Sequence, residues 1–187
     1  LFSSAASDVY KRQVPVVVVD DNDKVSFGSR AICFAKRTLE ICDRLGVGDP
    51  LVEKGVQWNL GKVFFDERKV YEFNLLAEEG HHRPAFINLQ QYYVEVYLFE
   101  RLKVLQDNGA PIHIRGKTKV TTLTQTDNQA MLCLETPEDC YEISADWVLA
   151  CDGANSTTRR MLGLDFVGHV FEDNFLIADV TMEAHFP

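Results

Sequence analysis

The chain has no glycine before Gly28, no Cys-x-x-Cys pair and no uninterrupted apolar stretch of membrane-spanning length. A membrane helix needs about 20 consecutive apolar residues, so the sequence offers no candidate span. Its five cysteines are irregularly spaced, which is typical of reduced thiols in a cytoplasmic protein rather than of a disulfide framework. His81 and His82 are adjacent and form no helical metal-binding pair, so we expect no metal site.

Positive charge is also scarce. The 187 residues carry 19 Lys and Arg against 28 Asp and Glu, a formal net charge of -9. Nucleic-acid binding needs clustered basic residues to meet the phosphates, so the balance excludes that class of partner. A hydrophobic fraction of 46% and a charged fraction of 25% are typical of a globular protein. The length suits one domain, or one domain and the start of a second.

The hydrophobic pattern predicts an α/β chain, because period-two strands alternate with helices whose apolar residues recur every three or four positions. The expected elements are a strand over Val14–Asp20, a helix from Ser29 to about Leu45, a hairpin within 56–73, a helix over Gln90–Asp107, a strand over Pro111–Ile114 and a three-stranded antiparallel meander over Lys119–Ser144. Gly46 is placed to cap the end of the first helix.

The most informative stretch is 145–160. The apolar run Trp147–Cys151 predicts a fully buried strand of a parallel sheet, and it ends in Asp152-Gly153. Ser156 is then expected to cap a short helix. Open α/β sheets bind their ligands at the carboxyl ends of their strands. There Gly153 would let a ligand approach the backbone, and Asp152 could accept hydrogen bonds from ribose or ribityl hydroxyls.

The stretch 152–159 resembles the Asp-Gly motif of the FAD-dependent aromatic hydroxylases, the group A flavoprotein monooxygenases. Three further stretches fit that family in the same order. Val16–Asp20 is similar to the second strand of its nucleotide-binding unit, 29–31 to its Ser/Pro-Arg-Ala, and Gln91 with Glu95 and Leu98 to the glutamine that opens a long helix. The resemblance covers the chain from about residue 14 to its end.

The resemblance implies a Rossmann-like FAD-binding domain of the glutathione-reductase type with an inserted antiparallel β-meander. Residues 14–172 would form part of it, and 173–187, with a strand over Phe175–Met182, would begin the substrate-domain sheet. The family's Gly-x-Gly-x-x-Gly and Gly-Asp-Ala motifs are missing, so we expect a central fragment truncated at both ends. Residues 1–13 resemble translated sequencing-adapter read-through, which predicts a non-native tail; an ordinary polar tail is the alternative.

Two groups of cofactor-binding residues follow from the resemblance near the start of the chain. Asp20 would bind the adenosine ribose hydroxyls, with Asp21 as the alternative, or it would be an ordinary acid at a strand end. Arg30 would contact the pyrophosphate, because guanidinium binds phosphate in a bidentate manner; otherwise it is a solvated side chain. Ser29 and Ala31 would let the backbone approach.

Two further groups lie later in the chain. Gln91 would bond the ribityl or pyrophosphate part of the flavin, with Gln90 as a rival by position. Asp152 and Gly153 would help to hold FAD. Arg159 is included with the cofactor site, although the favoured role is to tie the motif to neighbouring backbone or carboxylates, and a purely structural helix arginine is the alternative. No residue can be assigned to the chemical step.

The function implied is that of an FAD-dependent monooxygenase. NAD(P)H would reduce bound FAD, and dioxygen would then hydroxylate a phenolic aromatic substrate, with the flavin carrying the chemistry. An FAD-dependent dehydrogenase, reductase or halogenase of the same fold is one alternative, and a non-catalytic truncated fragment is another. We expect the 187-residue chain alone to be inactive and to bind FAD weakly or not at all.

Overall fold

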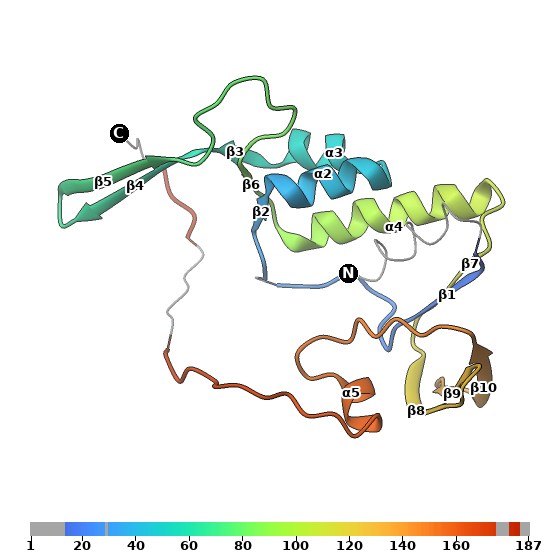
Figure 1. Cartoon of the computed structure of the whole chain (residues 1–187). Coiled ribbons are helices and arrows are strands. Elements are labelled where there is room, and N and C mark those ends of the chain that lie inside the picture. Colours follow the sequence, from blue (N-terminus) through green and yellow to red (C-terminus); the bar gives the residue numbers. More distant parts are fainter. Residues whose placement is uncertain (1–13, 29, 175–179, 184–187) are drawn as a thin grey trace.

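A computed structural model of the chain describes residues 14–28, 30–174 and 180–183. It is a mixed α/β structure in which α2, α3 and α4 pack together, while the hairpin β4–β5 projects to one side (Figure 1). The elements are β1 (Val16–Val19), β2 (Cys33–Ala35), α2 (Lys36–Leu45), α3 (Gly48–Lys54), β3 (Val56–Trp58), β4 (Leu60–Phe65), β5 (Arg68–Asn74), β6 (Phe86–Asn88), α4 (Gln91–Asp107), β7 (Ile112–Arg115), β8 (Lys119–Gln125), β9 (Ala130–Glu135), β10 (Cys140–Ala145) and α5 (Thr157–Met161).

Helix α4 joins two hydrophobic clusters. In its first half, Leu98 packs with Leu39 and Leu45 of α2 and with Ile87 of β6. In its second half, Leu102 packs with Ile112 and the neighbouring strands. Strands β1 and β7 pair in parallel, from Val16 opposite Ile112 to Val19 opposite Arg115. The predicted strands over Val14–Asp20 and Pro111–Ile114 and the predicted helix over Gln90–Asp107 are therefore confirmed. Helix α4 packs the β1–β7 pair against the helical layer.

The helix predicted from Ser29 begins only at Lys36, so that part of the prediction was wrong. Cys33–Ala35 form β2, which pairs antiparallel with β6, and Ile32 is 49% exposed instead of lying on a buried helical face. The spacing alone does not decide between the two structures, because pairing with β6 satisfies the same backbone groups. The end of the helix was predicted correctly: Gly46 adopts the left-handed conformation, with φ of 81°.

The hairpin and the meander have the predicted form. Strands β4 and β5 pair antiparallel with a register shift between Val63 and Phe64. Strands β8, β9 and β10 form a three-stranded antiparallel sheet in the order β10-β9-β8. Both rest on short connections with turn-forming residues, which fix neighbouring strands in antiparallel register.

The predicted buried strand at Trp147–Cys151 is wrong for this structure. Residues 147–151 have no regular secondary structure, and Trp147 is 87% exposed and Leu149 63% exposed. A strand forms only where its N–H and C=O groups meet a partner, and within the described residues β1 and β7 pair only with each other. Residues 175–179 of the predicted strand Phe175–Met182 lie outside the described part, and 180–182 show no regular structure.

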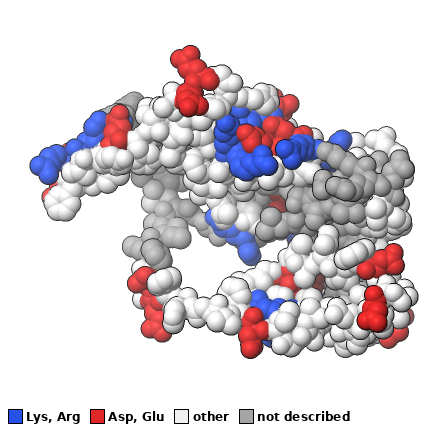
Figure 2. Space-filling view, in the orientation of Figure 1, with Lys and Arg blue, Asp and Glu red and all other residues white. Residues whose placement is uncertain are grey.

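None of the described helices combines the length and the apolar character that a membrane crossing requires. Over α2 and α3, acidic and basic side chains lie next to one another (Figure 2).

Candidate functional site

Asp20 lies directly after β1, at the carboxyl end of the parallel pair. Its N–H donates to the carbonyl of Arg115 at 3.0 Å, and its own carbonyl accepts from Thr118 N–H at 2.9 Å. One carboxylate oxygen, Oδ1, accepts from the backbone N–H of Asn22 at 2.8 Å. The second oxygen has no protein donor among the described residues, so it is open to a ligand hydroxyl. The alternative, Asp21, is exposed and accepts from the Asn22 amide at 3.0 Å.

Glu95 connects the loop after β1 to the start of α4. Its two oxygens accept from Ser26 N–H at 2.5 Å and Ser26 Oγ at 2.8 Å, and from Gln91 Nε2 at 2.7 Å. Desolvation raises the pKa of Glu95, but the bonds from Ser26 and Gln91 outweigh it and leave the pKa below its usual range. Glu95 therefore stays ionised at neutral pH, and the amide of Gln91 is held in one orientation.

Arg30 and Ala31 are exposed and have no regular secondary structure, so the predicted place of Arg30 in the first turn of a helix is wrong. The segment instead continues the pairing of β2 with β6, since Ile32 carbonyl accepts from Leu89 N–H at 2.7 Å. Because Leu89 comes two residues before Gln91, this pairing brings the Arg30 segment beside the start of α4. Ser29 lies outside the described residues.

Gln90 and Gln91 differ in their surroundings. Gln90 is exposed, lies just before the helix with φ of -60° and ψ of 135°, and makes no side-chain cap. Gln91 is partly buried and bonded to Glu95. The structure thus gives Gln91 the fixed position that a cofactor contact needs, although the contact itself stays a prediction.

Asp152 is held within its own turn. Its Oδ1 accepts from Ser156 Oγ at 2.5 Å, and its Oδ2 accepts from Thr158 N–H at 2.9 Å and from Thr157 Oγ1 at 3.3 Å. Desolvation raises the pKa of Asp152, but the bonds from Ser156 and Thr158 prevail and hold it well below the usual range. Gly153 has φ of 74°, and a Cβ there would meet no atom within 4 Å, which leaves room for a ligand against the backbone.

Ser156 caps α5 as predicted, since its side chain accepts from Arg159 N–H at 2.9 Å. Arg159 itself donates from Nη2 to the carbonyl of Ala154 at 2.9 Å, and its guanidinium lies 4.9 Å from the centroid of the Phe166 ring. This matches the favoured role, a tie to the neighbouring backbone. Among the described residues no hydrogen bond joins this group to Asp20 or to Gln91.

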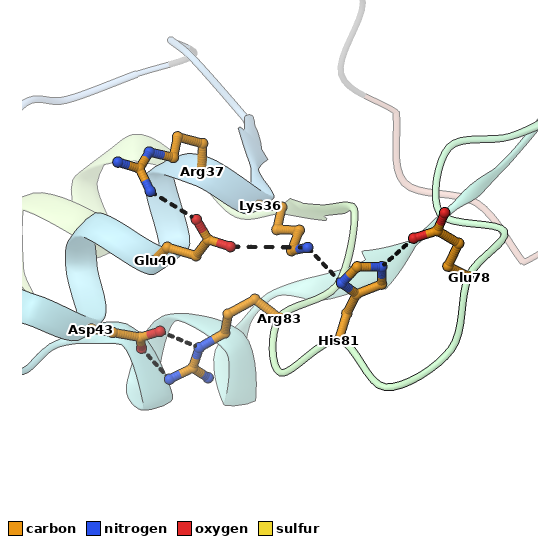
Figure 3. Close-up of polar contacts among 7 residues, drawn as sticks. All are labelled: Lys36, Arg37, Glu40, Asp43, Glu78, His81 and Arg83. Atoms are coloured by element: carbon orange, nitrogen blue, oxygen red, sulfur yellow. Dashed lines mark hydrogen bonds and ion pairs between the residues drawn. The ribbon is translucent and has the colours of Figure 1, made fainter.

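Sequence reasoning missed Arg83, the only charged side chain that is buried among the described residues. It reaches from the loop before β6 to Asp43 of α2 (Figure 3) and also donates to Asp49 of α3 at 2.6 Å. The bond with Asp43 raises the pKa of Arg83, and that of Asp43 is lowered in turn. No sequence signal could have found this pair, because the partners are 40 and 34 residues away.

Oxygen and nitrogen atoms of Asp43, Asp49 and His82 also lie within 4.8 Å of one another. Both carboxylates are already paired with Arg83, whose single positive charge offsets one of their two negative charges. The cluster is therefore a structural ion pair that holds α2, α3 and the loop before β6 together.

The site residues fit a nucleotide-type cofactor. Asp20 has an unused acceptor at a parallel strand end, the Arg30 segment leads into the pairing of Ile32 with Leu89 just before α4, and Gly153 leaves open space beside an ionised acid. Together with the parallel pair β1–β7, the antiparallel sheets and the helices, this arrangement is compatible with a cofactor-binding α/β domain.

The chain belongs to the family described as FAD binding domain, whose model matches residues 4–187. It is 28% identical over 182 residues to 6-methylpretetramide 4-monooxygenase of Streptomyces rimosus, covering 96% of this chain and 31% of that protein. It is 27% identical over 172 residues to 3-(3-hydroxy-phenyl)propionate/3-hydroxycinnamic acid hydroxylase of Mycolicibacterium gilvum, covering 89% and 28%. These matches confirm the predicted resemblance to flavin-dependent aromatic hydroxylases.

The structure is also similar to the crystal structure of p-nitrophenol 4-monooxygenase from Pseudomonas putida, with a TM-score of 0.81 and 26% identity, over 91% of this chain and 42% of that one. The chain thus spans 28% to 42% of the length of these relatives.

Proposed function

We propose that the chain is the FAD-binding part of an NAD(P)H-using monooxygenase that hydroxylates a phenolic aromatic compound. The observation that carries this proposal is the match along almost the whole chain to p-nitrophenol 4-monooxygenase, at 26% identity and a TM-score of 0.81. A second relative is named for hydroxylating a phenylpropionate that carries a phenolic hydroxyl. Both relatives share a phenolic ring as substrate, which supports that substrate class.

In this proposal the first half of the chain holds the nucleotide part of FAD. The unused oxygen of Asp20 accepts from the ribose hydroxyls, and Arg30 pairs with the pyrophosphate, with the backbone of Ser29 and Ala31 close by. Gln91, held by Glu95, presents its remaining amide atoms to the ribityl chain or the pyrophosphate. These groups bind and orient the cofactor, and none of them transfers a proton to substrate.

The Asp-Gly turn supplies the second group of cofactor contacts in this proposal. Gly153 lets the cofactor approach the backbone, and Asp152 stays ionised because Ser156 and Thr158 donate to it. Arg159 stabilises the turn through Ala154. The redox chemistry, hydride acceptance from NAD(P)H and activation of dioxygen, is supplied by the bound FAD.

The proposal includes the organisation of the chain and its location. Residues 14–172 form part of a Rossmann-like FAD-binding domain, and 173–187 begin the sheet of a substrate domain. The protein acts in the cytoplasm, as the irregular spacing of its cysteines suggests.

A second candidate is that the 187-residue chain by itself is not catalytic. The exposed apolar run at Trp147 and Leu149 favours it, because unpaired apolar segments of this kind are normally covered. This candidate is compatible with the first, since it concerns only the chain alone.

The test is to express the complete reading frame that contains this chain and to measure NADH and NADPH oxidation with oxygen uptake over a panel of phenols. We expect oxidation that is stimulated by a phenol and matched by a hydroxylated product. Oxidation without oxygen incorporation would instead assign a dehydrogenase or reductase, and a halide-dependent product would assign a halogenase. The 187-residue chain, assayed in parallel, should show no turnover.

A further inference from the structure

Glu95 is the only carboxylate among the described residues that joins the loop after β1 to α4 by hydrogen bonds. Three donors converge on its two oxygens: the backbone N–H and the hydroxyl of Ser26, and the side-chain amide of Gln91. Ser26 and Glu95 are 69 residues apart in the chain, so this contact is tertiary and not a local turn.

The two segments that Glu95 connects are those that carry candidate cofactor contacts. Six residues before Ser26 lies Asp20 at the end of β1, and one helical turn before Glu95 lies Gln91. The other end of the loop is tied to the connection between β7 and β8, since Lys117 pairs with Asp23 at 2.7 Å. The loop from 20 to 28 is therefore fixed at one side by Lys117 and at the other by Glu95.

We propose that Glu95 is a positioning residue: its carboxylate holds Ser26 and Gln91 in a fixed relation and so sets the geometry of the Asp20 and Gln91 contacts to the adenosine and ribityl parts of FAD. The inference rests on the proposed function, in which those two residues bind the cofactor.

The chemistry of the contact favours an ionised carboxylate over any other side chain. Hydrogen bonds to a charged acceptor are about twice as strong as neutral ones. A glutamine would offer one acceptor oxygen and an NH2 group, which would face the donors of Ser26 or Gln91 and leave at least one of them unpaired. The lowered pKa of Glu95 keeps the ionised form present at neutral pH.

The first readout needs no cofactor. In the apo form of the protein from the complete reading frame, Glu95→Gln should speed amide hydrogen exchange at Ser26 by at least about tenfold, since a bond to a charged group is lost. Amides in the middle of α4 should exchange as before. Glu100→Gln is the matched control, because Glu100 is exposed on the same helix and its side chain makes no hydrogen bond or ion pair among the described residues; it should leave exchange at Ser26 unchanged.

The second readout is FAD affinity by flavin fluorescence titration of the same protein. We expect Glu95→Gln to raise the Kd for FAD at least about tenfold. The thermal unfolding midpoint of the protein should stay unchanged. Glu95→Asp keeps the charge and should recover part of the lost affinity. The effect of Ser26→Ala should not add to that of Glu95→Gln, because both remove one connection.

The outcomes separate the inference from the function on which it rests. Unchanged exchange at Ser26, or faster exchange with unchanged FAD affinity, would overturn the role of Glu95. Failure of phenol-stimulated turnover with a clear loss of FAD affinity in Glu95→Gln would overturn the proposed reaction and leave the positioning role supported.

Discussion

The hydroxyl of Ser156 donates to Oδ1 of Asp152 at 2.5 Å, and the Ser156 Oγ atom in turn accepts from the backbone N–H of Arg159 at 2.9 Å. One side chain thus connects the acid of the Asp-Gly turn to the first turn of α5. The second oxygen of Asp152 accepts from Thr158 N–H, so the carboxylate also satisfies a free donor at the start of the helix. The turn and α5 form a single unit in which the motif's acid has a structural task besides any contact with a cofactor.

Replacing Ser156 with alanine should destabilise this unit. Loss of an N-cap typically costs about 1 kcal/mol, and Ser156 is buried, with 7% exposure, so water cannot readily replace its hydroxyl. We expect the free energy of unfolding in urea to fall by about that amount. Ser144→Ala, at an exposed position of β10, is the control and should change little. Equal stability of the two variants would contradict the capping role.

The depressed pKa of Asp152 predicts a pH dependence of stability. The unfolded chain titrates this group at about 3.9, and the folded chain at lower pH. The ionised form therefore adds stability that is complete above the unfolded value and is lost as the pH falls below it towards the folded value. In Asp152→Asn this contribution is absent at every pH. Urea unfolding should show that the free energies of unfolding of the two proteins differ most at neutral pH and become more alike as the pH falls below about 3.9. A difference that stays constant with pH would contradict the assignment.

The elements that the sequence predicted correctly are those decided by nearby residues. The apolar residues of α4 and the residues that end it lie within one continuous segment of sequence. Gly46 likewise ends α2 through its own left-handed conformation. The meander is likewise set by short turns between alternating strands. Ser156 was found for the same reason, since a cap bonds only three residues ahead.

The features that sequence reasoning missed depend on distant partners. Residues 33–35 become β2 only because β6 pairs with them, and the paired residues are 51 to 55 positions apart in the chain, from Ala35 with Phe86 to Cys33 with Asn88. The run Trp147–Cys151 has the composition of a buried strand, but composition does not supply a neighbour. Arg83 finds Asp43 through the packing of α2 against the loop before β6, which no local pattern records. The prediction that put Arg30 in a helix was wrong for the same reason, because Arg30 precedes β2 and β2 forms only by pairing with β6.

Because Arg83 is buried and paired with Asp43, we expect a substitution of Arg83 to lower the free energy of unfolding substantially. Arg83→Met would leave the carboxylate of Asp43, whose side chain is only 27% exposed, without its partner. We expect a loss of about 1.5 to 3 kcal/mol in the free energy of unfolding, the range for hydrogen bonds to charged groups. The stability of Arg83→Lys should lie between that of Arg83→Met and that of the unmodified protein. A lysine keeps the positive charge, but a single ammonium cannot bind Asp43 through two nitrogens.

The control for that experiment is Arg37→Met, because Arg37 pairs with Glu40 on the surface at 67% side-chain exposure. Exposed pairs contribute at most about 1 kcal/mol, so this variant should be nearly as stable as the unmodified chain. Matching losses for Arg83→Met and Arg37→Met would show that burial adds nothing to the Arg83 contact.

Gly48 gives the sharpest test of how α3 meets this ion pair. In an open helix position, glycine to alanine stabilises by about 1 kcal/mol. Here, however, a Cβ would lie 1.8 Å from Oδ1 of Asp43 and 2.9 Å from Nη2 of Arg83. Because Gly48→Ala must displace Asp43 from Arg83, we expect it to destabilise the chain in urea unfolding, opposite to the helix propensity. In an Arg83→Met background the bond is already lost, so the same substitution should be nearly neutral or stabilising. A destabilisation of equal size in both backgrounds would place the strain elsewhere than at the Asp43–Arg83 contact.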